Sequence, residues 1–97
     1  MTRSESQCRE WIKETYPGCL VLKIPDFKMT SSGVASGWPD FLVVHGGVTF
    51  FVECKTWKAK SFTKAQLYLF PLIVEKGGVV LVWVKERRGF SVGNYFP

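Results

Sequence analysis

The sequence predicts an α/β domain built on a mixed β-sheet flanked by helices, with its elements in the order αβββαβ. Segments with apolar residues at helical spacing alternate with short runs of branched residues bounded by glycine or proline, which are typical of strands. Two of these runs are separated only by Gly46 and Gly47, a pair that favours a tight hairpin. With 97 residues and 46% hydrophobic composition, the chain is long enough for its own core. We therefore expect residues 1–97 to form a single domain.

The first elements are a helix and a strand. Thr2 or Ser4 can cap a helix that runs to about Thr15, because a hydroxyl oxygen accepts a hydrogen bond from the first turn. The inward stripe of this helix, at spacing i, i+3 and i+4, consists of Cys8, Trp11 and Ile12. Residues 19–24 are typical of a strand. The loop expected at 25–37 has a length that favours a role in binding.

A second helix is expected after the hairpin. Ser61 or Thr63 can cap it, and it extends to about Lys76. Its apolar side is expected to consist of Leu67, Phe70 and Val74. Pro71 predicts a kink or a local break, because proline lacks an N–H and its ring collides with the preceding turn. Residues 79–84 lack alternation, which indicates a central strand buried on both faces.

The hairpin places two carboxylates opposite each other. With the two glycines as the turn, the register pairs Asp40 with Glu53, and like charges at such a pair are destabilising unless something neutralises them. Alternation along the strand puts Lys55 on the same face as Glu53. Asp26 also follows a proline, but no turn pairs it with Glu53. Asp40, Glu53 and Lys55 are therefore the expected site.

The types of residue at this site favour a hard metal ion. Carboxylates without histidine or cysteine partners select Mg²⁺ or Mn²⁺ over zinc, and such ions usually bind one or two carboxylates together with substrate phosphate. This combination is typical of phosphodiester hydrolysis, in which Lys55 would orient the attacking water and offset charge on phosphorus. The plainer alternative is that Lys55 only neutralises two carboxylates at the end of a sheet.

The same residues resemble a known superfamily. Gly37-Trp38-Pro39-Asp40 followed by Glu53-Cys54-Lys55 resembles the two half-motifs of the PD-(D/E)xK nucleases, which have a restriction-endonuclease-like αβββαβ core. Within that superfamily, residues 4–84 are similar to the virus-type replication-repair nuclease (VRR-NUC) domain. Its pattern is a glutamate on the first helix, G-x-P-D, E-x-K and a glutamine on a later helix. Cysteine between Glu53 and Lys55 departs from the apolar residue that is usual there.

The resemblance implies a role for each matching residue. The implied metal ligands are Asp40, Glu53 and the backbone carbonyl of Cys54, with Lys55 as the catalytic lysine. The helix acid that joins them maps to Glu5, with Glu10 as the alternative, and the helix glutamine maps to Gln66. Structural explanations also exist, because Glu5 suits the dipole of its helix and Thr63 with Gln66 forms a capping box.

The charge balance favours a polyanionic partner. Thirteen Lys and Arg residues against eight Asp and Glu give a net charge of +5, which suits nucleic acid or an anionic membrane surface. The longest apolar run is too short to span a bilayer, and we expect no membrane partner. The lysines expected to contact DNA phosphates are Lys23, Lys28, Lys58, Lys60 and Lys64.

The predicted function is a Mg²⁺-dependent endonuclease that cleaves branched DNA such as Holliday junctions, in DNA repair, recombination or replication. Stand-alone domains of the family resemble Holliday junction resolvases, which implies a homodimer that could also cover Trp57, Phe62 and the C-terminal aromatic residues. The alternatives are a restriction-type or linear-end nuclease, and a non-catalytic DNA-binding or nuclease-inhibitor module. A polar N-terminus and unpaired cysteines predict a cytoplasmic location. We expect the cell to be bacterial or phage-infected.

Overall fold

The computed structural model describes residues 1–25 and 36–96 of the chain. Within these residues the elements are α1 (Arg3–Thr15), β1 (Leu20–Lys23), β2 (Phe41–His45), β3 (Val48–Thr56), α2 (Lys64–Glu75), β4 (Val80–Lys85) and β5 (Phe90–Asn94). The strands form one sheet in the order β1-β2-β3-β4-β5, with β3 and β4 parallel and the other neighbours antiparallel. Asp26, Lys28 and most of the loop predicted at 25–37 lie outside the described residues. The predicted α/β fold with a mixed sheet is confirmed.

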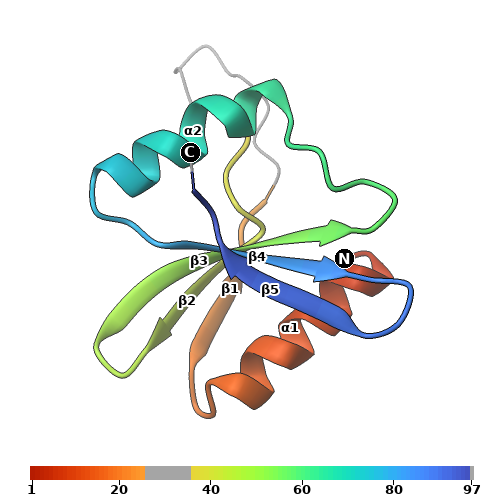
Figure 1. Cartoon of the computed structure of the whole chain (residues 1–97). Coiled ribbons are helices and arrows are strands. Elements are labelled where there is room, and N and C mark those ends of the chain that lie inside the picture. Colours follow the sequence, from red (N-terminus) through yellow and green to blue (C-terminus); the bar gives the residue numbers. More distant parts are fainter. Residues whose placement is uncertain (26–35, 97) are drawn as a thin grey trace.

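The two helices cover opposite faces of the sheet (Figure 1). The core between α1 and the sheet consists of Cys8, Ile12, Phe41, Val43, Phe50, Val52 and Trp83. Because side chains alternate along a strand, Glu53 and Lys55 of β3 point to the other face, where α2 lies. α1 begins after Thr2, its N-cap, and ends at Thr15, as predicted. None of the helices in the described ranges is long and apolar enough to cross a membrane.

The hairpin of β2 and β3 has the predicted turn and register. Gly46 and Gly47 have φ values of 56° and 79°, a left-handed pair that other residues rarely adopt. Phe41 pairs with Val52, which is one residue from the predicted pair of carboxylates. The predicted register is therefore confirmed.

The last part of the sheet differs from the prediction. β5, the segment Phe90–Asn94, pairs antiparallel with β4 and was not expected as a strand. β4 is interior, as predicted, but only Val80 and Trp83 are fully buried and its other residues are half-buried. Phe90 and Val92 do alternate with small or polar residues after a turn at Gly89, and this period-2 pattern was the available signal.

Two expectations about α2 are wrong. The helix is unbroken from Lys64 to Glu75, so the local break expected at Pro71 is wrong. Pro71 removes the hydrogen bond to the carbonyl of Leu67, and the Leu67 side chain is 56% exposed, so this turn faces water that can solvate the carbonyl. Leu67 was therefore wrongly placed on the inward side, which instead contains Gln66 and Phe70. A polar residue faces the sheet here because Glu53 supplies it with a partner.

Candidate active site

The two predicted carboxylates lie side by side at the open end of the hairpin. The backbone N–H of Asp40 donates to Glu53 Oε1 at 3.2 Å, and Asp40 Oδ2 accepts from the backbone N–H of Cys54 at 2.8 Å. Glu53 is 3% exposed, whereas Asp40 is half-buried. The Asp40 side chain thus continues the ladder of β2 and β3 beyond the last backbone pair and fixes the separation of the two acids.

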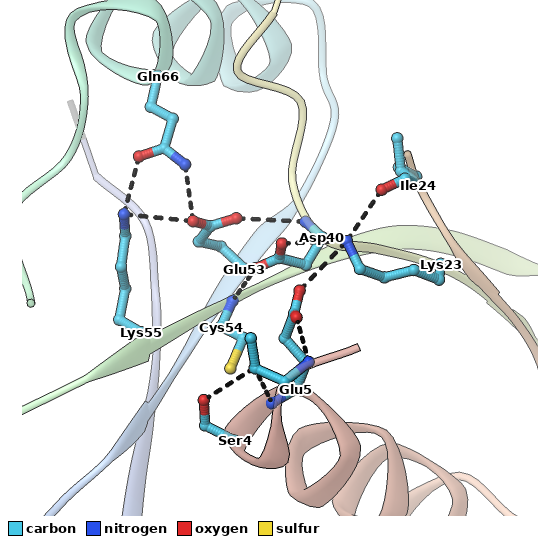
Figure 2. Close-up of polar contacts among 10 residues, drawn as sticks. Ser4, Glu5, Lys23, Ile24, Asp40, Glu53, Cys54, Lys55 and Gln66 are labelled. Atoms are coloured by element: carbon cyan, nitrogen blue, oxygen red, sulfur yellow. Dashed lines mark hydrogen bonds and ion pairs between the residues drawn. The ribbon is translucent and has the colours of Figure 1, made fainter. Parts of the chain in front are cut away.

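Lys55 and Gln66 complete a polar cluster around Glu53 (Figure 2). Gln66 Nε2 donates to Glu53 Oε2 at 2.7 Å, and Lys55 Nζ lies 3.3 Å from the same oxygen. Lys55 Nζ also donates to Gln66 Oε1 at 2.9 Å. That amide oxygen accepts in addition from the backbone N–H of Thr63, within a complete capping box. Gln66 is therefore both a helix cap and a member of the cluster.

Glu5 approaches the carboxylates from the opposite face, through a lysine. Lys23 Nζ lies 3.3 Å from Glu5 Oε2 and 3.4 Å from Asp40 Oδ1, and it donates to the carbonyl of Ile24 at 3.0 Å. Glu5 also closes the capping box of α1, since its Oε1 accepts from the backbone N–H of Thr2 at 2.8 Å. The alternative acid, Glu10, is exposed on α1. The structure thus brings Glu5, and not Glu10, towards Asp40.

Lys23 is the member of this cluster that sequence reasoning missed. It was expected only as a lysine beside the long loop, positioned for DNA. Its place follows from the antiparallel pairing of β1 with β2, which puts Lys23 opposite Phe41 and therefore beside Asp40. That pairing joins strands separated by the loop, so no local turn signal revealed it.

Burial and charge perturb the acids in different directions. Burial, followed by the charge of Asp40, raises the pKa of Glu53 to about 7, and the Lys55 ammonium only partly opposes this. Burial also acts to raise the pKa of Glu5, but hydrogen bonds from Thr2 and Lys23 hold it below its ordinary value. The α2 side of the site is therefore short of positive charge, whereas the α1 side is compensated.

The donors at this site fit a hard divalent cation. Asp40 and Glu53 supply adjacent carboxylate oxygens, and burial of two like charges is a cost that a cation offsets. The N–H of Cys54 points towards Asp40, and in a strand the carbonyl of the same residue points to the same side. Within the described residues, no group of three or more His, Cys, Asp and Glu side chains is close enough to hold a metal. A further ligand would therefore have to be a backbone oxygen, water or substrate.

The Cys54 side chain lies on the other face and packs against the core next to Cys8. The Cys8 thiol has a raised pKa because of its hydrogen bond with Cys54 and its burial. The expectation that Cys54 is a packed side chain agrees with these contacts.

The lysines expected at DNA do not form one group. Lys23 belongs to the carboxylate cluster, and Lys60 pairs with Glu86 at 3.3 Å. Lys58 is exposed and lies over the ring of Trp57 at 5.3 Å, while Lys64 is exposed at the start of α2. Lys58 and Lys64 thus remain open to solvent as the prediction requires.

A mixed sheet between two helices, with Asp40 and the Glu53-x-Lys55 segment at one end of its hairpin, has the restriction-endonuclease-like fold. Among solved structures, the chain is similar to Hjc, a Holliday junction resolvase from the archaeal hyperthermophile Archaeoglobus fulgidus. The TM-score is 0.69 at 15% sequence identity, over 97% of this chain and 76% of Hjc. At this identity the likeness establishes the fold alone. No family model and no curated protein matches the chain.

Proposed function

We propose that the protein is a Mg²⁺-dependent endonuclease of the VRR-NUC type that hydrolyses phosphodiester bonds in branched DNA, Holliday junctions included. The observation that carries this proposal is the cluster of Asp40, Glu53 and Lys55 at the end of the hairpin, held together by hydrogen bonds shorter than 3.3 Å. The fold shared with a resolvase supports the same reaction class.

Each residue of the cluster has a distinct role in this proposal. Asp40, Glu53 and the Cys54 carbonyl would hold Mg²⁺ or Mn²⁺, with Glu5 contributing through a bound water. The bound ion would polarise the scissile phosphate and lower the pKa of an attacking water. Lys55 would donate to that water or to a phosphate oxygen, so that its ammonium offsets charge developing on phosphorus.

Gln66 is a positioning residue in this scheme, because it acts through Glu53 and Lys55. Its amide donates to Glu53 and accepts from Lys55, so one side chain fixes the distance between the acid and the ammonium. Hydrolysis then forms a bond from the water oxygen to phosphorus and breaks the bond from phosphorus to the leaving oxygen. The proton that the water loses is taken up by the leaving oxygen.

The net charge of +5 supports DNA as the partner, and we propose that two copies act together on a junction. Trp57 and Phe62, which a dimer was expected to cover, are half-buried within the chain. Leu20 and Leu22 on the edge strand β1 are 68% and 56% exposed and are better candidates for the surface that a second copy covers. Light scattering at several protein concentrations would measure the oligomeric state.

The proposal is tested by cleavage of labelled DNA. A four-way junction and a linear duplex of the same sequence are incubated with the protein in Mg²⁺ or in EDTA. We expect strand cleavage of the junction in Mg²⁺ alone, with much slower cleavage of the duplex, and none by Asp40→Asn. Equal cleavage of both substrates would favour the linear-end or restriction-type alternative, and a folded protein that cuts neither would contradict a nuclease function.

A further inference from the structure

A basic hollow lies beside the proposed active site. It has a volume of about 670 Å³, and its lining includes Arg3 and Gln7 from the start of α1, Trp57 and Lys58 after β3, and Lys85 at the end of β4. Hollows of roughly 300–1,000 Å³ are the size of sites for small molecules. Its volume therefore suffices for a phosphate together with part of its sugar.

The positive charges of the hollow are not compensated by any acidic side chain of its own described lining. Three of its side chains are cationic, and none of its described lining residues is acidic. Within residues 1–25 and 36–96, the ion pairs involve Lys23, Lys55 and Lys60, and none involves Arg3, Lys58 or Lys85. These three cations repel one another, so an anion placed among them would be stabilised.

A neighbouring hollow differs from the basic hollow because its lining contains acidic side chains. It has a volume of about 420 Å³ and shares Arg3 and Lys85 with the basic hollow, but its lining adds Glu10 and Glu14. Charges of both signs balance there. An anion is therefore expected to bind in the basic hollow, which contains Lys58, rather than in its neighbour.

The Lys58 side chain and the backbone segment that carries Lys85 are held by the surrounding fold. The Lys58 ammonium lies over the Trp57 ring at 5.3 Å, and the Arg87 guanidinium lies over the same ring at 4.4 Å. The backbone N–H of Trp57 donates to the carbonyl of Lys85 at 2.8 Å, so the two chain segments are fixed to each other. Less conformational entropy is then lost when an anion binds.

The hollow is next to the carboxylate cluster along the chain at two points. Ser4, which contributes to its wall, directly precedes Glu5, and Trp57 follows Lys55 by two residues. Lys55 pairs with Val84, the residue before Lys85, so both sites lie at the same end of the sheet, with Lys85 on the α1 face and Lys55 on the α2 face. DNA that binds at the cluster and extends around this end of the sheet would meet the hollow on the α1 side.

We propose that this hollow binds a backbone phosphate of the DNA, on the α1 side of the phosphate that is cleaved, through Arg3, Lys58 and Lys85. The inference rests on the proposed nuclease function and adds its subsite. Contacts of this kind fix the register of a nucleic acid without reading its sequence, in keeping with a nuclease that recognises DNA shape.

The test measures how DNA binding depends on salt. Anisotropy of a fluorescein-labelled four-way junction is titrated in EDTA at several KCl concentrations, with the parent, Lys58→Gln, Lys85→Gln and the double variant. Lys13→Gln, the same charge change in the last turn of α1, is the matched control. Each lost phosphate contact should lower the slope of log K against log salt by about 1. We expect this loss for each single variant, about twice the loss for the double variant, and none for Lys13→Gln.

Slopes for Lys58→Gln and Lys85→Gln equal to that of Lys13→Gln would overturn the inference. If either variant fails to fold, Arg3→Gln replaces it. If the variants lower the slope but the parent cuts nothing in Mg²⁺, the proposed function is contradicted while the hollow stands as a phosphate site. A parent that cuts junctions, with slopes unchanged in the variants, would leave the function standing and remove the subsite. A parent that binds no DNA would overturn both.

Discussion

The two helices approach the same pair of carboxylates from opposite faces of the sheet, and they begin in the same way. Thr2 and Thr63 each cap a helix in a complete capping box, closed by Glu5 and by Gln66. Gln66 touches Glu53 directly at 2.7 Å, whereas Glu5 reaches Asp40 only through a lysine. The same capping box thus positions a residue that contacts a carboxylate directly in α2 and one that contacts a carboxylate through a lysine in α1.

The α1 side and the α2 side of the site differ in how deeply their charged side chains are buried. The side chains of Lys55 and Glu53 are 10% and 4% exposed, whereas those of Lys23 and Glu5 are 27% and 18% exposed. Water screens the charges of the α1 side more strongly, so its ion pairs contribute less and are cheaper to lose. The α2 side is therefore expected to carry the chemistry, with the α1 side in a supporting role.

The largest effect is expected from the buried acid. Glu53→Gln removes a charge and places an amide where Gln66 already donates, so junction cleavage should fall by on the order of 10²-fold or more. Glu75→Gln at the end of α2 is the matched control and should cleave as the parent does. The comparison is made with single-turnover rates in Mg²⁺. Near-normal cleavage by folded Glu53→Gln would place the chemistry elsewhere.

The second prediction concerns the free energy of unfolding and compares Gln66 with Glu5, the residues that close the two capping boxes. Gln66→Ala leaves half-buried Lys55 and buried Glu53 without their amide partner and should lower the free energy of unfolding by about 1–3 kcal/mol. Glu5→Ala removes a more exposed partner and should cost about 0.5–1 kcal/mol. Urea denaturation measures both. Equal losses would mean that burial does not distinguish the two sides.

The pH dependence of stability tests the charge deficit around Glu53. Its pKa is raised from the ordinary 4.5 to about 7, so between these values the folded protein holds a proton that the unfolded chain releases. Without metal, this group should therefore make stability fall as pH rises from about 5 to about 7. Mg²⁺ favours the ionised carboxylate, so its stabilising effect should be larger at high pH than at low pH.

Thermal melting of the parent beside Glu53→Gln isolates this contribution from those of other groups. We expect the difference between the two proteins to change with pH in EDTA over that range. A difference that stays constant would show that Glu53 titrates at its ordinary value.

The smallest effect is expected on the α1 side. Glu5→Gln keeps a side chain that closes a capping box but loses the charge that pairs with Lys23, so cleavage should fall by only a few-fold. Glu10→Gln should change nothing, because that side chain is exposed and lines the other hollow. Rates measured at low and high salt would show the Glu5 effect shrinking as salt rises.

The sequence predicted what depends on short-range geometry. Gly46 and Gly47 determine the turn, the turn determines the register, and alternation then brings Lys55 to the side of Glu53. The place of Lys23 was not predictable in this way, because it depends on the pairing of β1 with β2 across a long loop. The inward side of α2 was misjudged for a related reason. Hydropathy favoured Leu67 for burial, but the partner that makes burial of Gln66 favourable belongs to another strand.

The comparison of the two lysines tests the central claim most directly. Each ammonium pairs with a carboxylate of the cluster, Lys55 with Glu53 at 3.3 Å and Lys23 with Asp40 at 3.4 Å, so Lys55→Met and Lys23→Met remove matched groups from the two sides. Single-turnover cleavage of a four-way junction in Mg²⁺ should fall by about 10²–10³-fold for Lys55→Met and by less than about tenfold for Lys23→Met. Equal losses, or the larger loss for Lys23→Met, would contradict the assignment of the chemistry to the α2 side.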